Sequence, residues 1–268
     1  MKKILLYLEK KASKIEKRFR LVIGVLFCTL FMLFSTFYFF DKLWFFIPLL
    51  FILSIFSTYF VLLEKIDKVG WFGFFFMPTF LSISFYLFYF LFPGRWLTRF
   101  PFIIFYAISF YANLLITNIF FVGAQRNLAL YRAAFSVNFL YQTILAFFIF
   151  NVLFFLRQNF LFNMFVVAVI IFLLSLHLFW SIKLKNFFER EVVFFALLLA
   201  LMASEITFLL SIIPIKPTIA SLFLTSFYYS LAGIFYHLID EKLFKETIRE
   251  YLIVLGFVSL ITLLTLSW

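Results

Sequence analysis

The stretch VVFFALLLALMASEITFLLSII, residues 192–213, carries a single charged side chain, Glu205, in an otherwise uncharged run. A helix of this length spans a hydrocarbon core of ~30 Å, because each helical residue adds ~1.5 Å. The stretch therefore predicts a transmembrane helix. It also raises the question of what a carboxylate does inside a membrane.

The composition extends this prediction to the whole chain. Of the 268 residues, 66% are hydrophobic and 13% are charged, and a soluble domain of this size cannot cover so much apolar surface. Each membrane crossing needs roughly 20 residues, so spans and short connections use up most of the chain. No room remains for a soluble catalytic domain.

Apolar runs separated by charged residues predict an all-α, polytopic transmembrane helix bundle of about nine spans. No run alternates as a membrane barrel strand does, which leaves helices as the structure that satisfies the backbone in lipid. The predicted spans are residues 21–40, 43–63, 71–92, 102–122, 135–156, 161–182, 192–213, 218–239 and 251–267.

Lys and Arg residues predict the orientation. With these spans, 18 of the 23 basic residues fall on the side of the N-terminus and 5 on the other side. Because basic residues gather in cytoplasmic loops, the N-terminus is expected in the cytoplasm and the C-terminus outside. The net charge of +11 thus reports membrane orientation, and no nucleic-acid partner is expected.

Residues 1–20 are expected to form an amphipathic basic helix on the cytoplasmic surface, ahead of one transmembrane domain over residues 21–268. Apolar residues recur there at helical spacing, and lysines and arginines fill the remaining positions. The expected partners are anionic lipid headgroups, each basic residue contributing ~1 kcal/mol near the surface. The alternative is a topology signal without lipid specificity.

Glu205 is the first candidate for a functional residue. A charged side chain at this depth costs at least ~2.5 to 3.5 kcal/mol on insertion scales, and no Lys or Arg lies within a predicted span. We therefore expect Glu205 to be protonated, or to bind an ion or a substrate cation. Small residues gather on the opposite face of this helix, which predicts contacts on both sides and makes lipid the least expected neighbour of Glu205.

Three other polar residues are predicted at similar depth in neighbouring spans: Asn113, Gln142 and Tyr228. Together with Glu205 they define a candidate intramembrane polar or ion site. The alternative is that each amide forms a hydrogen bond with a neighbouring helix, as polar residues in membrane bundles commonly do.

A second candidate site lies at the cytoplasmic interface. It comprises His237, Asp240 and Glu241, together with Arg126 and Arg132 in the stretch GAQRNLALYR. A histidine three and four residues before two acids is compatible with acid–base work, and arginine suits phosphate. However, no zinc motif, phosphate loop or nucleophile elbow occurs, and Cys28 is the only cysteine. No cofactor, metal or catalytic residue is predicted, and an interfacial histidine with solvated acids is the alternative. His177, near the cytoplasmic end of the predicted span 161–182, is likewise expected at the interface.

These patterns leave three hypotheses for an integral protein of the cell membrane of a prokaryote. The first is a transporter or channel-like protein for a small solute, ion or lipid, with Glu205 as its protonatable site. The second is a membrane subunit or scaffold that acts through helix contacts with a protein partner. The third is an enzyme that acts on a lipid-linked substrate at the cytoplasmic face.

Overall fold

The computed structural model describes residues 15–38, 42–63, 68–122, 128–185 and 187–265. Within these ranges the chain forms nine long α-helices and no strand. The helices are α2 (Lys17–Ser35), α3 (Leu43–Leu62), α4 (Lys68–Tyr89), α5 (Trp96–Val122), α6 (Leu128–Phe155), α7 (Phe160–Lys183), α8 (Arg190–Ile212), α9 (Pro217–Ile239) and α10 (Lys245–Leu264).

The described helices confirm the predicted number of long apolar helices and their all-α character. Each of the nine contains a segment long and apolar enough to cross a membrane, and each overlaps one predicted span. The largest differences are at the starts of α5, α6 and α10, which begin at Trp96, Leu128 and Lys245 rather than at 102, 135 and 251. A charged residue ends the part of a helix that lies in the hydrocarbon, but it does not end the helix itself. Helical turns outside the hydrocarbon can be hydrated, so the helices start earlier than the spans. The orientation of the termini stays a prediction, and most of the predicted surface helix lies outside the described residues.

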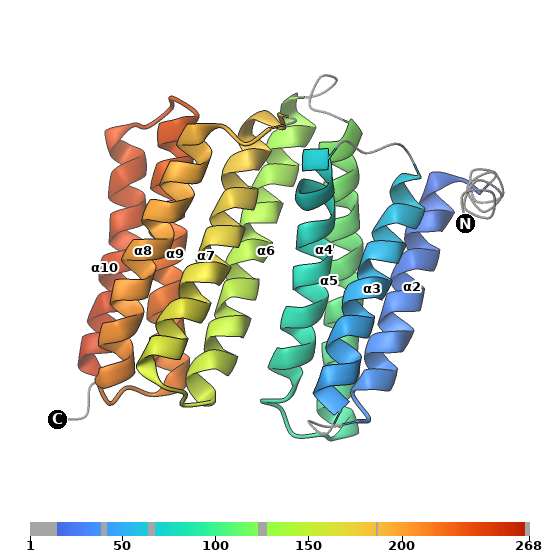
Figure 1. Ribbon diagram of the computed structural model, residues 1–268, viewed down its shortest axis with the longest axis horizontal. Coiled ribbons are helices and arrows are strands. Elements are labelled where there is room, and N and C mark those ends of the chain that lie inside the picture. Colours follow the sequence, from blue (N-terminus) through green and yellow to red (C-terminus); the bar gives the residue numbers. More distant parts are fainter. Residues whose placement is uncertain (1–14, 39–41, 64–67, 123–127, 186, 266–268) are drawn as a thin grey trace. The chain divides into compact units, whose positions relative to one another are not determined.

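Contacts between residues divide the chain into two compact units, Met1–Asn138 and Phe139–Trp268, with the boundary inside α6. In unit 1, α2 packs on α3 and α5, and α4 packs on α3 and α5. In unit 2, α7 packs mainly on α8, α9 packs on α10, and both α7 and α8 also contact α9. Successive helices within each unit run antiparallel, so their connections alternate between the two ends (Figure 1). The single domain expected over residues 21–268 stays a prediction.

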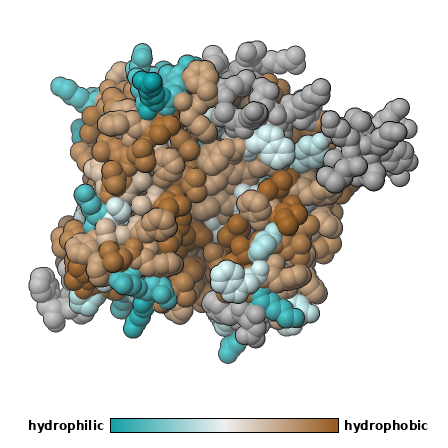
Figure 2. Space-filling model, viewed as in Figure 1, coloured by the Kyte–Doolittle hydropathy of each residue, from teal (hydrophilic) through white to brown (hydrophobic). Residues whose placement is uncertain are grey.

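The surface has the character expected for a membrane protein. Apolar side chains cover the long sides of the helices, and hydrophilic residues gather toward the helix ends (Figure 2). Large exposed apolar residues occur along whole helices, such as Phe257 on α10 at 66% exposure. Water would penalise this surface, whereas lipid chains accept it.

Small residues set the packing of α8. Ala196, Ala200, Ala203 and Thr207 are all buried, and α8 makes its most extensive contact with α7. Small side chains let two helix backbones approach closely, which increases van der Waals contact in a medium that gives no hydrophobic drive. The predicted small-residue face of α8 is therefore its packing face.

We predict that Gly233→Ala destabilises unit 2. A Cβ atom at Gly233 on α9 would overlap the ring of Tyr251 on α10, and relieving such overpacking costs roughly 1–3 kcal/mol. Thermal unfolding of the detergent-solubilised protein should therefore occur at a lower temperature.

Gly256→Ala is the matched control, since no atom lies within 4 Å of a Cβ built at that α10 glycine. Helix propensity alone favours alanine over glycine by roughly 1 kcal/mol, so this variant should be as stable as the parent or more stable. Equal effects of the two substitutions would show that Tyr251 does not restrict this contact.

Candidate functional site

A buried hydrogen-bonded cluster joins three helices of unit 2. The Tyr228 hydroxyl on α9 donates to Gln142 Oε1 on α6 over 3.0 Å, and Gln142 Nε2 lies 2.8 Å from His177 Nδ1 on α7. None of the three residues is more than 1% exposed. Because buried polar groups need partners, these bonds fix how α6, α7 and α9 meet.

The cluster also defines the state of His177. An amide nitrogen donates and does not accept, so Nδ1 accepts from Gln142 and the imidazole carries its proton on Nε2. Protonation of Nδ1 would require the Gln142 amide to turn over and present its oxygen. Tyr228 would then face an NH₂ group, from which a phenol oxygen can accept.

Two of the four residues predicted for the intramembrane site, Gln142 and Tyr228, are in direct contact. Their third partner, His177, was expected at the membrane interface because it lies near the end of its span. The structure shows it to be buried among the helices of unit 2, at 1% exposure, and its depth in the membrane stays a prediction. The signal in the sequence was its position inside an apolar run, six residues before Lys183.

Glu205 does not join this cluster. It lies on α8, exposed, on the side opposite Ala203 and Thr207, and no described residue forms a hydrogen bond or ion pair with it. Within unit 2 only the small-residue side of α8 is covered, and the predicted contact on the Glu205 side stays a prediction. The physical reason for this one-sided coverage is that α7 and α9 both contact α8, and its small-residue face accommodates that packing.

Asn113 belongs to unit 1, on α5, and so is not part of the cluster as described. Its side chain is 0% exposed, and neither amide atom has a hydrogen-bond partner among the described residues. Asn138, in the unit 1 part of α6, is also fully buried, and neither of its amide atoms has a partner among the described residues. Such amides carry a cost of roughly 1–3 kcal/mol until a partner satisfies them.

The residues predicted for the cytoplasmic interface belong to both units, and one of them lies outside the described residues. Arg126 lies outside the described residues, and Arg132 is exposed on α6 in unit 1. In unit 2, His237 contacts the rings of Tyr236 and Tyr251, Asp240 pairs with Lys242 over 2.7 Å, and Glu241 is exposed. No group of three metal-binding side chains occurs in the part of the chain that the structure describes.

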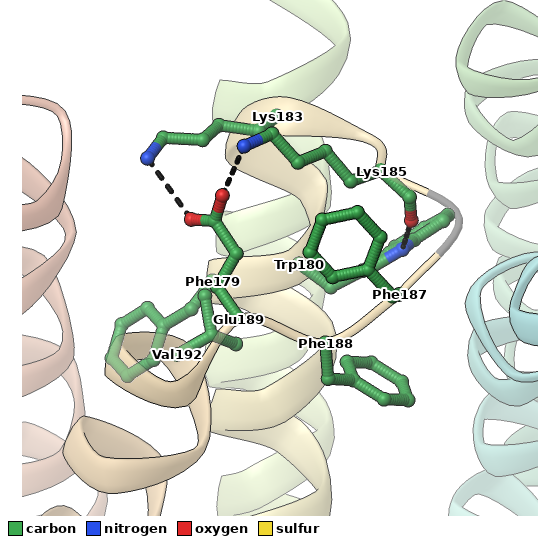
Figure 3. Close-up of a pocket in the computed structure, with 8 residues that line it drawn as sticks. All are labelled: Phe179, Trp180, Lys183, Lys185, Phe187, Phe188, Glu189 and Val192. Carbon is green, nitrogen blue, oxygen red and sulfur yellow. Dashed lines mark hydrogen bonds and ion pairs between the residues drawn. The ribbon is translucent and has the colours of Figure 1, made fainter.

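At the same end of unit 2, the α7–α8 connection contains a closed ion-pair cluster (Figure 3). Glu189 pairs with Lys183 over 3.0 Å and also with Lys185. The Trp180 indole donates to the Lys185 carbonyl over 2.9 Å, which holds the turn. The hydrogen bonds from Lys185 and Lys183 lower the pKa of the Glu189 carboxyl. Both lysines thus have an ion-pair partner within the protein, and the cluster keeps one net positive charge.

The nine apolar helices and the buried polar cluster indicate a polytopic helical membrane protein. The chain belongs to the family described as "Protein of unknown function (DUF5656)", whose model matches residues 62–265. That match includes all of unit 2 except its last three residues. No curated protein and no solved structure matches the chain.

We predict that Tyr228→Phe destabilises unit 2. The substitution leaves Gln142 Oε1 without its donor in a buried site, and hydrogen bonds inside membrane proteins contribute roughly 0.6 to 1.7 kcal/mol. A fall in the unfolding temperature of the solubilised protein would measure this loss. The control is Tyr229→Phe, because the neighbouring ring stacks on Phe139 and its hydroxyl has no described partner. If both variants unfold at the same temperature, the Tyr228 hydroxyl is not stabilising.

The lowered pKa of Glu189 predicts a pH-dependent contribution to stability. A carboxyl with a depressed folded-state pKa stabilises the fold above its unfolded pKa, and this contribution disappears as the pH falls through the folded-state pKa. The stability difference between the parent and Glu189→Gln should therefore be largest at neutral pH and vanish in acid. A difference that is constant over this pH range would contradict the ion-pair origin.

Proposed function

We propose that this chain is a subunit of a membrane complex in the cell membrane of a prokaryote, and that α8 contacts the transmembrane helix of a different protein. The observation that carries the proposal is the exposure of Glu205 within an apolar helix face. Glu205 is about 10 Å from the C-terminal end of α8, so it cannot easily reach the headgroups from a helix that crosses the membrane.

The energetics favour a covered site over one facing lipid. A carboxylate in the hydrocarbon costs at least ~2.5 to 3.5 kcal/mol, and intramembrane acids typically face a bundle interior or pair with a partner. Unit 2 already uses the opposite face of α8 for packing. A partner helix that covers the exposed face would remove Glu205 from lipid without rearranging this packing.

The shape of the exposed face fits a helix. Its apolar residues follow the three- and four-residue spacing of a helix–helix seam: Phe194, Leu197, Leu201, Phe208 and Ile212, each at least 36% exposed. Glu205 interrupts this seam between Leu201 and Phe208. A partner helix would contact apolar side chains over several turns and meet one carboxylate near the middle of the seam.

Charge complementarity indicates the chemistry of the partner. A Lys or Arg in the partner helix would neutralise Glu205 and gain a charge-assisted hydrogen bond. The described helices of a second copy offer no Lys or Arg near the middle of a helix, because their basic residues all lie within the first five residues or at the last residue of a helix. Two copies would instead bring two acids together, so the proposed complex is heteromeric.

Photo-crosslinking from α8 tests this proposal. A benzophenone side chain placed at Leu201 or Phe208, one turn on either side of Glu205, should capture a membrane protein in native membranes. The same probe at Phe257 on exposed α10 is the control and should not capture it. Glu205→Leu should reduce capture at least several-fold, whereas Glu205→Asp should retain it.

The captured protein must also satisfy the charge prediction. Its contacting helix should contain a Lys or Arg whose replacement by leucine gives the same loss, and exchanging the two charges between the proteins should restore capture. Crosslinks only to lipid, or only to a second copy of this chain, would overturn the proposal. So would a partner whose recovery does not depend on Glu205.

Transport of a small solute, ion or lipid is the second candidate function. The observation that favours it is the buried Gln142–His177–Tyr228 cluster, because a titratable residue inside a membrane bundle marks proton or solute pathways. In vesicles with an imposed proton gradient, the purified protein should carry protons, and His177→Gln should abolish that flux. Flux equal to that of empty vesicles would remove this candidate.

A further inference from the structure

A pocket of about 550 Å³ opens at one end of unit 2, at the opposite end from the Glu189 ion-pair cluster. The α6–α7 and α8–α9 connections lie together at this end (Figure 1), which the distribution of basic residues predicts to be external. The pocket lining includes Arg157, Asn163, Leu210, Ile213, Pro214 and Lys216. It is independent of both the exposed face of α8 and the buried cluster.

The charged residues of this pocket have one sign. Arg157 follows α6 and Lys216 precedes α9, and the lining contains no Asp or Glu. Neither cation forms an ion pair within the part of the chain that the structure describes. By contrast, Lys183 and Lys185 at the other end of the unit share Glu189. The pocket therefore presents two positive charges that the protein leaves available to a ligand.

Asn163 gives a second, independent indication of a ligand. It lines the pocket with 3% of its surface exposed. Its Nδ2 donates to the Gln158 carbonyl over 3.4 Å and to Ser211 Oγ over 3.3 Å. Because a backbone carbonyl only accepts, this contact fixes the orientation of the amide. Its Oδ1 then remains as a buried acceptor without a partner among the described residues.

The size and walls of the pocket narrow the class of ligand. Sites for small molecules commonly have volumes of roughly 300–1,000 Å³ with mainly apolar walls and a few polar groups. Leu210, Ile213 and Pro214 supply such walls here, so the pocket is larger than a simple inorganic anion requires. The guanidinium of Arg157 suits a phosphate oxygen pair, and Asn163 Oδ1 requires a donor.

We propose that this pocket binds the phosphate of a ligand that also carries a hydroxyl or amine group, with Arg157 and Lys216 contacting the phosphate and Asn163 accepting from the donor. Both a phospholipid headgroup and a soluble phosphate ester have this chemistry. The site adds a ligand to unit 2 and does not depend on the partner proposed for α8.

Binding to the purified full chain tests this proposal. Native mass spectrometry should show that phosphatidylglycerol is retained in preference to phosphatidylcholine, or that soluble glycerol 3-phosphate binds. The first result alone identifies a lipid headgroup, and binding of glycerol 3-phosphate identifies a soluble ester. Arg157→Gln combined with Lys216→Gln should weaken the binding that is observed by about tenfold or more. Both residues are exposed, so the fold should tolerate the change.

The matched control is Lys183→Gln combined with Lys185→Gln, which removes the same charge from the opposite end of the unit. It should leave binding unchanged. Equal losses of binding in the two double variants would show that net charge alone causes the effect, and this would overturn the site. The absence of preferential binding by either probe would also overturn it. Dimethyl phosphate, an anion without a donor, should bind about tenfold more weakly than glycerol 3-phosphate if the ester is soluble. Equal binding of these two anions would exclude the role of Asn163.

Discussion

The need to satisfy every polar group without water governs this structure. In the hydrocarbon of a membrane, an unpaired backbone amide or carbonyl costs several kcal/mol, so a spanning segment must form its hydrogen bonds internally. The nine described helices meet this requirement along their backbones. Each polar side chain inside the membrane must likewise find a hydrogen-bond partner. Thr207, for example, donates to the Ala203 carbonyl one turn earlier over 2.7 Å, and in this way a hydroxyl is buried at little cost.

The same requirement explains how the protein treats its buried cation in unit 1. Arg99 is only 6% exposed, and no carboxylate pairs with it among the described residues. Its guanidinium instead donates to the Tyr89 hydroxyl and the Thr36 carbonyl, each over 3.2 Å, and lies 4.2 Å from the centre of the Phe37 ring. Carbonyl, phenol and aromatic face together replace water around the charge. The abundant aromatic residues therefore have an electrostatic use here as well as a packing one.

Much of this architecture follows from local sequence, because hydrophobic length and charge position act on each segment separately. The spans and the small-residue face of α8 could be predicted for that reason. The contact between Gln142 and Tyr228 was predictable only as a hypothesis, since it depends on which helices become neighbours. The burial of His177 and its bond to Gln142 could not be predicted, because position along a helix does not show which of its faces neighbouring helices cover. Whether neighbours also cover the opposite side of α8 depends on tertiary packing, so the exposure of Glu205 could not be predicted from helical periodicity.

The unpaired charged residues of unit 2 indicate candidate binding sites, because other charged residues of the same unit form ion pairs. Unit 2 pairs Asp240 with Lys242, and Glu189 with two lysines. These charged side chains already have partners within the protein and need no ligand. Glu205, Arg157 and Lys216 have no such partner in the described residues. Hydration can satisfy Arg157 and Lys216 at a membrane surface, and a ligand must compete with that water. Hydration cannot satisfy Glu205 to the same degree, because its neighbours on α8 are apolar. A polar contact from another molecule would therefore stabilise Glu205 more than it would stabilise Arg157 or Lys216. The difference in solvent therefore favours a permanent protein contact at Glu205 and an exchangeable ligand at the pocket.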